Sequence, residues 1–400
     1  MSAAQARIRE SLARRAAALD ALAARVHAHP ELGYEETRAC AWQIALLRHW
    51  RFRVDHPFAG LPTAYRASAG RGRPVFCLMA EYDALPEIGH ACGHNLICAA
   101  ALGAGVALAD RLRGERLPGT VVVMGTPAEE SQGGKVRMTA RGALRGIDAA
   151  MMAHPSFRTI ADNGCAAITR YDVVFHGRAA HAAGQPEQGL NALDAVLLLF
   201  QGINAWRQQL PESSRIHGVV RDGGAAPNII PERASATFFL RSPDDAVLDA
   251  MVARFRDIAR GAALMTGTTF HLSPARDAYQ SRLPNGPLNE AYREAAAAAG
   301  LDVQPTPPTG RASTDFGNVS HRIPGSHVYF GIATTKIPLH SVAFRRAAGT
   351  ALARARMRRA AEALAAVGYR FFTDAAFRRA VEDDFRRASR AGANAPRASE

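Results

Sequence analysis

The sequence of 400 residues is poor in lysine and cysteine and has no long uninterrupted apolar run. Lys135 and Lys336 are the only lysines, so almost all of the positive charge behind the net charge of +13 is arginine. Five cysteines, an odd number without closely spaced pairs, argue against a disulfide framework and predict reduced thiols. No apolar run reaches the roughly 18 residues that a membrane span needs, and residues 1–15 lack the apolar stretch of a secretory signal. We therefore expect a cytoplasmic protein with no membrane partner.

The arginine excess is greatest near the C-terminus, which raises the question of a nucleic-acid partner. From Arg345 to the last residue there are 13 arginines against 6 aspartates and glutamates, so this segment carries +7 of the net +13. Its arginine pairs recur within helical patterns, which is typical of a solvated helix face. No platform of interleaved aromatic and basic residues accompanies them, so we expect no nucleic-acid partner. An RNA-binding role for this segment is the alternative.

The length indicates two domains, because a single hydrophobic core rarely serves 400 residues. The first part of the chain alternates helical patterns with short apolar runs that are typical of buried parallel strands. Helices are predicted at 4–28, 37–50 and 95–112, and strands at 75–80, 120–125 and 149–153. This alternation predicts an α/β catalytic domain over residues 1–166, with a mostly parallel sheet covered by helices.

The pattern changes after residue 166. From 167 to 282, strands of alternating hydrophobicity at 169–176, 236–240 and 268–272 are interspersed with helices at 191–209 and 244–263, which predicts an inserted α+β domain. Residues 283–388 return to the first pattern, with helices at 288–299 and 350–367 and a strand at 328–331. The insert therefore splits the catalytic domain. Residues 389–400 are rich in alanine, glycine, asparagine and proline and predict a flexible tail.

Side chains that bind metal ions recur in five short motifs placed far apart in the sequence. They are Glu81-Tyr82-Asp83, Cys92-Gly93-His94, Glu129-Glu130, His154 and His340. The first, third and fourth follow predicted strands, at the edge where an open α/β sheet places its binding sites. Together the motifs supply a thiolate, imidazoles and carboxylates, with one carboxylate to spare beside a ligand. Hydrolysis by a pair of divalent metal ions needs this set.

Each motif taken alone has a simpler explanation, as a buried thiol, a helix cap, a surface acidic pair or a structural histidine. Their joint occurrence favours the metal site. Gly93 allows a tight turn, so Cys92 and His94 can converge on one point. Adjacent carboxylates such as Glu129 and Glu130 point in different directions at a strand end. One can therefore bind metal while the other reaches the metal-bound water.

The order of these motifs resembles peptidase family M20, the di-metal hydrolases of the aminoacylase and carboxypeptidase G type. The resemblance runs from His27-Ala28-His29-Pro30-Glu31-Leu32 to beyond His340 and is nearest to the amidohydrolase branch with the Cys-Gly-His motif. That branch includes β-alanyl-lysine dipeptidase-like proteins and aminobenzoyl-glutamate hydrolase. The stretches that resemble the dipeptidase-like group are 81–97, 125–135, 189–194, 227–231 and 313–320. The resemblance implies an inserted ferredoxin-like domain that acts as a lid and in dimerisation, and hence a homodimer.

The resemblance also implies roles for individual residues. The residues that match metal ligands are Cys92, His94, Glu130, His154 and His340. Glu129 matches the general base, and Asp83 matches a carboxylate that orients a ligand. In the insert, His181 matches a histidine that stabilises the oxyanion in the partner subunit's site. Asn228 and Arg241 match positions that hold the substrate's carboxylate.

Several other residues have weaker signals. Glu81 stands where many relatives outside this branch carry a metal-binding histidine, and His94 compensates for it. Asp315, in Ser313-Thr314-Asp315, is expected near the site, with loop structure as an equal candidate for its role. The remaining histidines of the N-terminal motifs are expected to be structural rather than ligands: His27, His29 and His90.

These implied roles predict a metal-dependent amidohydrolase or peptidase. Two divalent ions, zinc or manganese, activate a water that attacks the amide bond of an N-acyl amino acid or a dipeptide with a free carboxylate. Glu129 takes the water's proton and passes it to the leaving amine. The alternative keeps the site and changes the reaction to deamination, or to amide hydrolysis of an aromatic or modified small molecule. A non-enzymatic homologue is disfavoured, because it would not need both the base and all five ligands.

Overall fold

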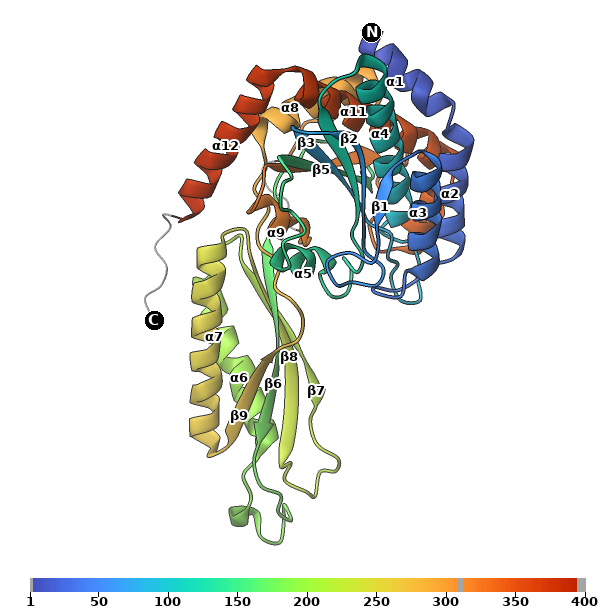
Figure 1. Cartoon of the computed structure of the whole chain (residues 1–400). Helices are drawn as coiled ribbons and strands as arrows, with labels where there is room; N and C mark the ends of the chain where they lie inside the picture. Colours follow the sequence, from blue (N-terminus) through green and yellow to red (C-terminus); the bar gives the residue numbers. More distant parts are fainter. Residues whose placement is uncertain (1–2, 308–311, 394–400) are drawn as a thin grey trace. The chain divides into compact units, whose positions relative to one another are not determined.

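The structure is a computed structural model that describes residues 3–307 and 312–393, and the chain forms two compact units (Figure 1). Among the described residues, the first unit comprises 3–164, 282–307 and 314–391, and the second comprises 165–281, 312–313 and 392–393. The second unit is therefore inserted into the first. The sequence pattern places the two junctions at 166 and 282.

The centre of the first unit is a six-stranded sheet with the order β1-β2-β4-β3-β5-β10. The strands that run parallel to one another are β3 (Val75–Ala80), β4 (Gly119–Gly125), β5 (Ala149–Ser156) and β10 (Gly325–Gly331). One edge is antiparallel, formed by β1 (Arg53–Asp55) and β2 (Tyr65–Arg71). Every residue of β3 is buried, as its uninterrupted apolar sequence requires. The mostly parallel sheet is confirmed, although the antiparallel edge gave no clear signal in the sequence.

Helices cover both faces of this sheet because alternate side chains of its strands point to opposite sides. Phe76 and Leu78 join a large core with the helices on one face. These are α1 (Ala3–Ala13), α2 (Ala16–Ala28), α3 (Thr37–His49), α4 (His94–Glu115), α8 (Gly286–Ala298), α10 (Val342–Ala348), α11 (Ala351–Thr373) and α12 (Ala375–Ala393). Cys77 and Met79 join a smaller core with α5 (Gly134–Ala140) and α9 (Phe316–Ser320) on the other face.

Three details of the sequence-based prediction are wrong. The predicted helix over 4–28 is two helices, α1 and α2, which are separated by a turn at Arg14 and Arg15. Strand β5 continues to Ser156, so His154 lies inside the strand rather than after its end. Helix α12 extends to Ala393, so 389–393 are helical instead of a tail, and 394–400 lie outside the described residues.

Helix α4 is the one described helix that is long and apolar enough to cross a bilayer. However, 94% of its apolar stretch is buried inside the protein. Its many small residues let it lie close to the sheet, and Gly105 packs directly on Val123 of β4. The helix therefore has the surroundings of a core helix, and the absence of a membrane partner stays a prediction.

The second unit is a four-stranded antiparallel sheet with two helices on one face. The sheet has the order β7-β8-β6-β9, formed by β6 (Ala167–His176), β7 (Arg215–Asp222), β8 (Arg233–Ser242) and β9 (Thr269–Pro274). With α6 (Ala192–Trp206) and α7 (Asp245–Thr266), the chain order is β-α-β-β-α-β, so the predicted ferredoxin-like insert is confirmed. Asn191 and Asp244 cap the two helices by accepting backbone N–H groups. The sequence analysis missed β7, which is an edge strand and mostly exposed.

Candidate metal centre and active site

Three predicted ligands meet in a buried cluster at the carboxyl end of the parallel strands. Gly93 adopts the left-handed conformation (φ 78°) at the start of α4, which turns Cys92 and His94 toward the same side. The Sγ atom of Cys92 lies 3.3 Å from Nε2 of His154. Ligand atoms of these three residues lie within 4.8 Å of one another, and all three are buried. Soft and borderline metal ions prefer such a set of one sulfur and two imidazole nitrogens.

A second group shares Cys92 with the first. Ligand atoms of Cys92, Glu130 and His340 also lie within 4.8 Å of one another, and Oε1 of Glu130 is 3.3 Å from Nε2 of His340. His340 is half exposed, and its backbone is held at φ 56° by an N–H bond to the carbonyl of Ala91. Because Cys92 belongs to both groups, its sulfur stands between two potential cation positions. The structure thus brings all five predicted ligands together.

Asp83 fixes the orientation of two of these residues. The Nδ1–H of His94 donates to Oδ1 of Asp83 at 2.8 Å, which leaves Nε2 facing the cluster. The other oxygen of Asp83 accepts the backbone N–H of Glu130 at 2.8 Å. His154 is oriented in a similar way, because its Nδ1–H donates to the carbonyl of Pro155 at 2.7 Å. Hydrogen bonds on the far nitrogen of a histidine are typical of metal ligands, since they fix the tautomer and the ring plane.

The protonation of the cluster is set by burial and by the crowding of charges. Burial lowers the pKa of His154 to about 4, so its imidazole is neutral and can bind a cation. Burial raises the pKa of the Cys92 thiol well above its usual range, and a thiolate there would need a cation beside it. Burial lowers the pKa of His94 but Asp83 raises it, and the net direction is well above the usual range. Metal binding at His94 and Cys92 would therefore release protons.

The two adjacent glutamates differ in pKa. Burial opposes ionisation of Glu130, but hydrogen bonding to His340 and the charge of His94 lower its pKa to about 2. Burial raises the pKa of Glu129 well above its usual range, and the nearby carboxylates of Glu81 and Glu130 add to this effect. Glu130 thus has the character of a permanent anionic ligand. Glu129 instead has the character of a carboxylate that accepts and holds a proton, which is what a general base must do.

These residues fit a pair of divalent cations. Among the described residues, nothing hydrogen-bonds to Nε2 of His94 or to Oε2 of Glu81, although both atoms are buried. The two atoms lie 3.5 Å apart. Buried polar atoms without a hydrogen bond are rare in proteins, and a bound cation would satisfy both atoms. The donor set of sulfur, imidazole nitrogen and carboxylate oxygen is one that zinc and manganese both accept.

The sequence analysis missed Lys135 and left the role of Asp315 open. Lys135 is fully buried in α5, and its Nζ lies 2.5 Å from Glu81 and 2.7 Å from Asp315. Burial lowers the pKa of Lys135, but the two carboxylates outweigh it and the net direction is upward. Burial raises the pKa of Asp315 to about 6 against the opposing effect of Lys135. The one available signal was that a chain nearly free of lysine has one of its two lysines close after Glu129-Glu130.

The predicted site residues of the insert do not form one group. His181 is exposed and adjoins Ile229 through a short bridge, and the N–H of Ala182 bonds to the carbonyl of Asn228. Arg241 lies at the other end of β8, where it donates to Ser313 at 2.9 Å. The rise from Arg233 to Arg241 alone is roughly 26 Å at about 3.3 Å per residue. Asn228 and Arg241 of one chain therefore lie too far apart to hold the same carboxylate, and their roles in substrate binding stay predictions.

His181 has the tautomer that an oxyanion donor needs. Its Nδ1 accepts the backbone N–H groups of Ala183 at 3.2 Å and Gly184 at 3.0 Å. The hydrogen of a neutral ring must then be on Nε2. This loop therefore presents an imidazole N–H donor to whatever approaches it.

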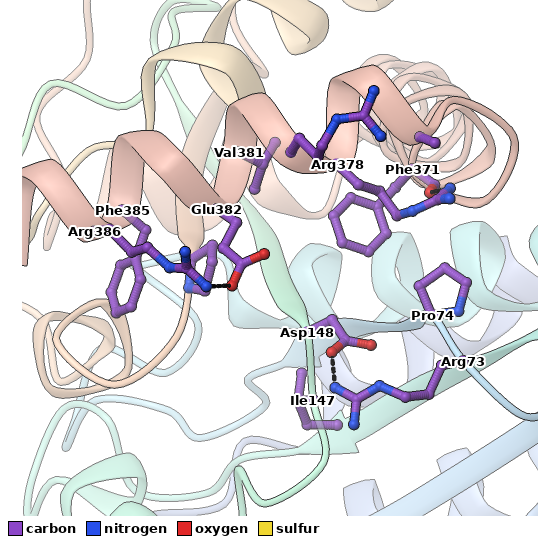
Figure 2. A pocket seen from close by; sticks show the side chains of 13 residues that line it. Arg73, Pro74, Ile147, Asp148, Phe371, Arg378, Val381, Glu382, Phe385 and Arg386 are labelled. Carbon is purple, nitrogen blue, oxygen red and sulfur yellow. Dashed lines mark hydrogen bonds and ion pairs between the residues drawn. The ribbon is translucent and has the colours of Figure 1, made fainter.

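A separate cavity of about 700 Å³ lies at the amino ends of β3 and β5, where Arg73 and Asp148 line it together with α12 (Figure 2). Its charged groups are largely paired within the chain. Arg73 bonds to Asp148, and Arg386 bonds to Glu382. Arg378 donates to the carbonyl of Phe371 at 2.8 Å. The arginines of this segment thus resemble a solvated and locally paired helix face, and we assign no ligand to the cavity.

Comparison with known proteins agrees with the fold and with the motifs. The sequence profile described as Peptidase family M20/M25/M40 matches residues 77–355. Xaa-Arg dipeptidase of Homo sapiens is 38% identical over 375 residues, which cover 87% of this chain and 84% of the relative. One of the two p-aminobenzoyl-glutamate hydrolase polypeptides of Escherichia coli (strain K12) is 34% identical over 291 residues, which cover 68% of this chain and 60% of that relative.

A solved structure gives the same result for the fold. A dinuclear metal binding peptidase of family M20 from Bacillus subtilis superposes with a TM-score of 0.65 at 24% identity, over 87% of this chain and 97% of the other. The chain belongs to peptidase family M20/M25/M40. It is a metal-dependent hydrolase of peptide or amide bonds, as the resemblance implied.

Proposed function

We propose that the chain hydrolyses the amide bond of a dipeptide or an N-acyl amino acid that has a free carboxylate. The observation that carries this proposal is the buried cluster in which Cys92 is shared by two groups of ligands, with Glu129 beside it. The relatives support the substrate class. One is named for dipeptides of the Xaa-Arg type, and another for aminobenzoyl-glutamate, which is an N-acyl amino acid.

The residues of the cluster have different roles in the proposed hydrolysis. Two divalent ions, held by the five ligands, would supply Lewis-acid polarisation of the amide carbonyl and would acidify a water. Glu129 takes a proton from that water on its carboxylate and delivers it to the nitrogen of the leaving amine. Asp83 holds the His94 ring and the Glu130 backbone in place through this cycle. Amide hydrolysis needs both proton transfers. A carboxylate of raised pKa suits them better than one of low pKa, because it accepts a proton more readily and can still release it.

The identity of the metal is part of the proposal. The Cys92 thiolate favours a borderline-soft ion such as Zn²⁺, whereas the carboxylate of Glu130 also suits Mn²⁺. Either ion accepts the imidazoles of His94, His154 and His340. Elemental analysis of protein purified without added metal separates the two.

A homodimer that shares its active sites is the second part of the proposal. One insert presents His181 with Asn228 at one end and Arg241 at the other, so it cannot bring all three to one substrate. Two copies can, if Arg241 serves the chain's own site and the loop of His181 serves the partner's. Strand β7 supports an interface through the insert, because it is an edge strand on which Val219 is 50% and Val220 is 40% exposed.

We also propose a reducing, cytoplasmic location. All five cysteines are buried free thiols, and Cys92 would be lost as a ligand on oxidation.

A substrate panel tests the proposed reaction. We expect cleavage of Xaa-Arg dipeptides, of p-aminobenzoyl-glutamate or of simple N-acyl amino acids, and loss of cleavage when the C-terminal carboxylate is amidated. Metal content is measured on the same sample. Release of ammonia from an aromatic amine, without cleavage of any amide in the panel, would favour deamination instead.

A further inference from the structure

Beside the five ligands lies a further group of acidic side chains, which we term the carboxylate cluster: Glu81, Glu129 and Asp315. One oxygen of each lies within 4.8 Å of the others. By spacing alone, this cluster could hold a cation, as could the other three groups of ligand atoms, one of which joins Glu129 to His94 and Glu130. It contains Glu129, the residue to which we assign proton transfer, so its occupant matters for the reaction.

The cluster already contains a cation that belongs to the chain. The Nζ atom of Lys135 lies 2.5 Å from Oε1 of Glu81 and 2.7 Å from Oδ1 of Asp315. The backbone N–H of Lys135 donates to the other oxygen of Asp315 at 2.9 Å. The side chains of Lys135, Glu81 and Asp315 are each at most 1% exposed. Solvent therefore cannot balance these charges, and the ammonium group is their direct partner.

The backbone around Lys135 is built to place it there. Lys135 is the second residue of α5, directly after Gly133 and Gly134. A Cβ atom on Gly134 would lie 1.9 Å from the carbonyl oxygen of Pro127. Only glycine allows this approach, which brings the start of α5 against the segment that leads from β4 to Glu129. The lysine is thus directed back into the cluster by the same loop that carries the general base.

Buried carboxylates without a cation repel each other and are costly, so something positive must lie among them. A tethered ammonium differs from a metal ion in one respect that matters here. It hydrogen-bonds to carboxylates but leaves their oxygens basic, whereas a divalent ion would coordinate them. A Glu129 that coordinated a metal ion would have its lone pairs engaged and could not accept a proton from water.

We propose that Lys135 is the resident cation of the carboxylate cluster and keeps a divalent ion out of it, so that Glu129 stays available as a proton acceptor. This inference rests on the proposed function for the role of Glu129. In this scheme Lys135 is a positioning residue, since it acts on the reaction through its neighbours. It also accounts for Asp315, which joins the ammonium to the start of α5.

The number of bound ions tests the inference without any substrate. Purified wild type, Lys135→Met and Lys336→Met are titrated with Mn²⁺, and the free ion is followed by its EPR signal. Lys336 is the other lysine of the chain and is exposed, so its substitution controls for the loss of one positive charge. We expect Lys135→Met to bind one more ion per chain than wild type and Lys336→Met. The additional ion should be lost in Lys135→Met/Asp315→Asn, which lacks one of its carboxylates.

Turnover gives a second result that a purely structural role would not produce. In Lys135→Met, turnover at saturating substrate should fall by about tenfold or more as Mn²⁺ is raised beyond the amount that saturates wild type. Wild type and Lys336→Met should show no such fall. A Lys135→Met protein that is folded by circular dichroism and binds the same number of ions as Lys336→Met would overturn the inference.

Thermal unfolding answers the same question if Lys135→Met folds poorly. An additional site predicts that its Tm keeps rising at Mn²⁺ concentrations above those that saturate wild type. A Tm that stops rising at the wild-type concentration overturns the inference as well. Failure of wild type itself to bind Mn²⁺ or Zn²⁺ would instead overturn the proposed metal centre.

Discussion

Gly93 packs directly against Pro155, the residue that follows His154, so that a Cβ atom on Gly93 would lie 2.5 Å from Cγ of Pro155. This contact joins the turn that carries Cys92 and His94 to the strand that carries His154. The geometry of the candidate metal centre therefore depends on the absence of a side chain at position 93. The positive φ of Gly93 adds a second reason for glycine.

Gly93→Ala should accordingly reduce both metal content and stability. Strain from the positive φ costs about 1–2 kcal/mol, and the overlap with Pro155 adds about 1–3 kcal/mol. Gly72→Ala is the matched control, because Gly72 also has a positive φ but has open space where its Cβ would lie. Metal content and Tm of the two variants are compared, and equal losses in both would show that the contact with Pro155 is unimportant.

Cys92→Ser should lose most of the bound metal, because a neutral hydroxyl is a far poorer ligand than a thiolate. The control is Cys98→Ser, which changes another buried thiol of the same region that hydrogen-bonds to the carbonyl of Asn95. Elemental analysis after dialysis measures the difference. Unchanged metal content and activity in Cys92→Ser would remove this residue from the ligand set.

Glu129→Gln should keep the fold and most of the metal while turnover falls by roughly 10²–10⁴-fold, the usual contribution of general acid–base catalysis. The amide cannot accept the proton. Glu130→Gln is the adjacent control and should lose metal as well as turnover, because Glu130 is assigned as a ligand. Near-normal turnover in Glu129→Gln would show that another group is the base.

Mixing two inactive variants tests whether His181 acts on the partner's site. His181→Ala and Glu129→Gln should each be nearly inactive as homodimers. In a mixed dimer, one site receives both defects, and the other combines an intact Glu129 with the partner's intact His181. Full exchange should restore about a quarter of wild-type activity, since half of the dimers are mixed and each has one intact site.

A mixture of Glu129→Gln and Cys92→Ser is the control for this experiment, because both residues belong to the same unit and no intact site can arise. If exchange between dimers is verified and the His181→Ala mixture stays inactive, then His181 acts within its own chain or is structural. The metal assignments would not be affected by that outcome.

Glu36 predicts a pH dependence of stability. It is fully buried and accepts hydrogen bonds from Thr63 at 2.9 Å and from the N–H of Ala128 at 2.8 Å. Burial and the nearby charge of Asp83 raise the pKa of Glu36 to about 7. The folded state therefore holds this proton more tightly than the unfolded state does. The resulting stability is present below the unfolded pKa of about 4.3 and is lost as pH rises through 7.

Glu36→Gln should therefore gain stability relative to wild type as pH rises from 5 to 8, by an amount on the order of 2 kcal/mol. The glutamine can still accept from Ala128 and can donate to Thr63. Urea unfolding at several pH values measures the difference, with a chelator present so that pH-dependent metal binding does not contribute. A stability difference that is the same at pH 5 and pH 8 would contradict the shifted pKa.

Much of the fold follows from local patterns in the sequence. Val75–Ala80 is apolar at every position, and a strand buried on both faces needs that pattern. Helical spacing of apolar residues predicted the two helices of the insert. Their predicted first residues, Asn191 and Asp244, cap the helices in the structure. Strands β2 and β7 escaped notice because each is partly exposed, and β7 also lies at the edge of its sheet, which weakens the apolar signal.

The candidate ligands were also visible in the sequence, because metal binding demands particular side chains: Cys92, His94, Glu130, His154 and His340. Their chemistry is local, and the turn at Gly93 needs only its own residues. Lys135 was not visible in the same way. An ammonium group becomes the partner of Glu81 and Asp315 only when three segments far apart in the sequence meet in a place without water.

The sequence by itself determined the family, the candidate ligands and the split catalytic domain, because these depend on residue identity and on periodicity. Only the tertiary structure decided that Cys92 is shared by two groups and that Asp83 orients both His94 and Glu130. It also placed Arg241 near the end of β8 and Asn228 in the turn that precedes the start of this strand. The physical reason is that distances between side chains depend on how strands pair and in which direction they run, and strand pairing joins residues that the sequence keeps far apart.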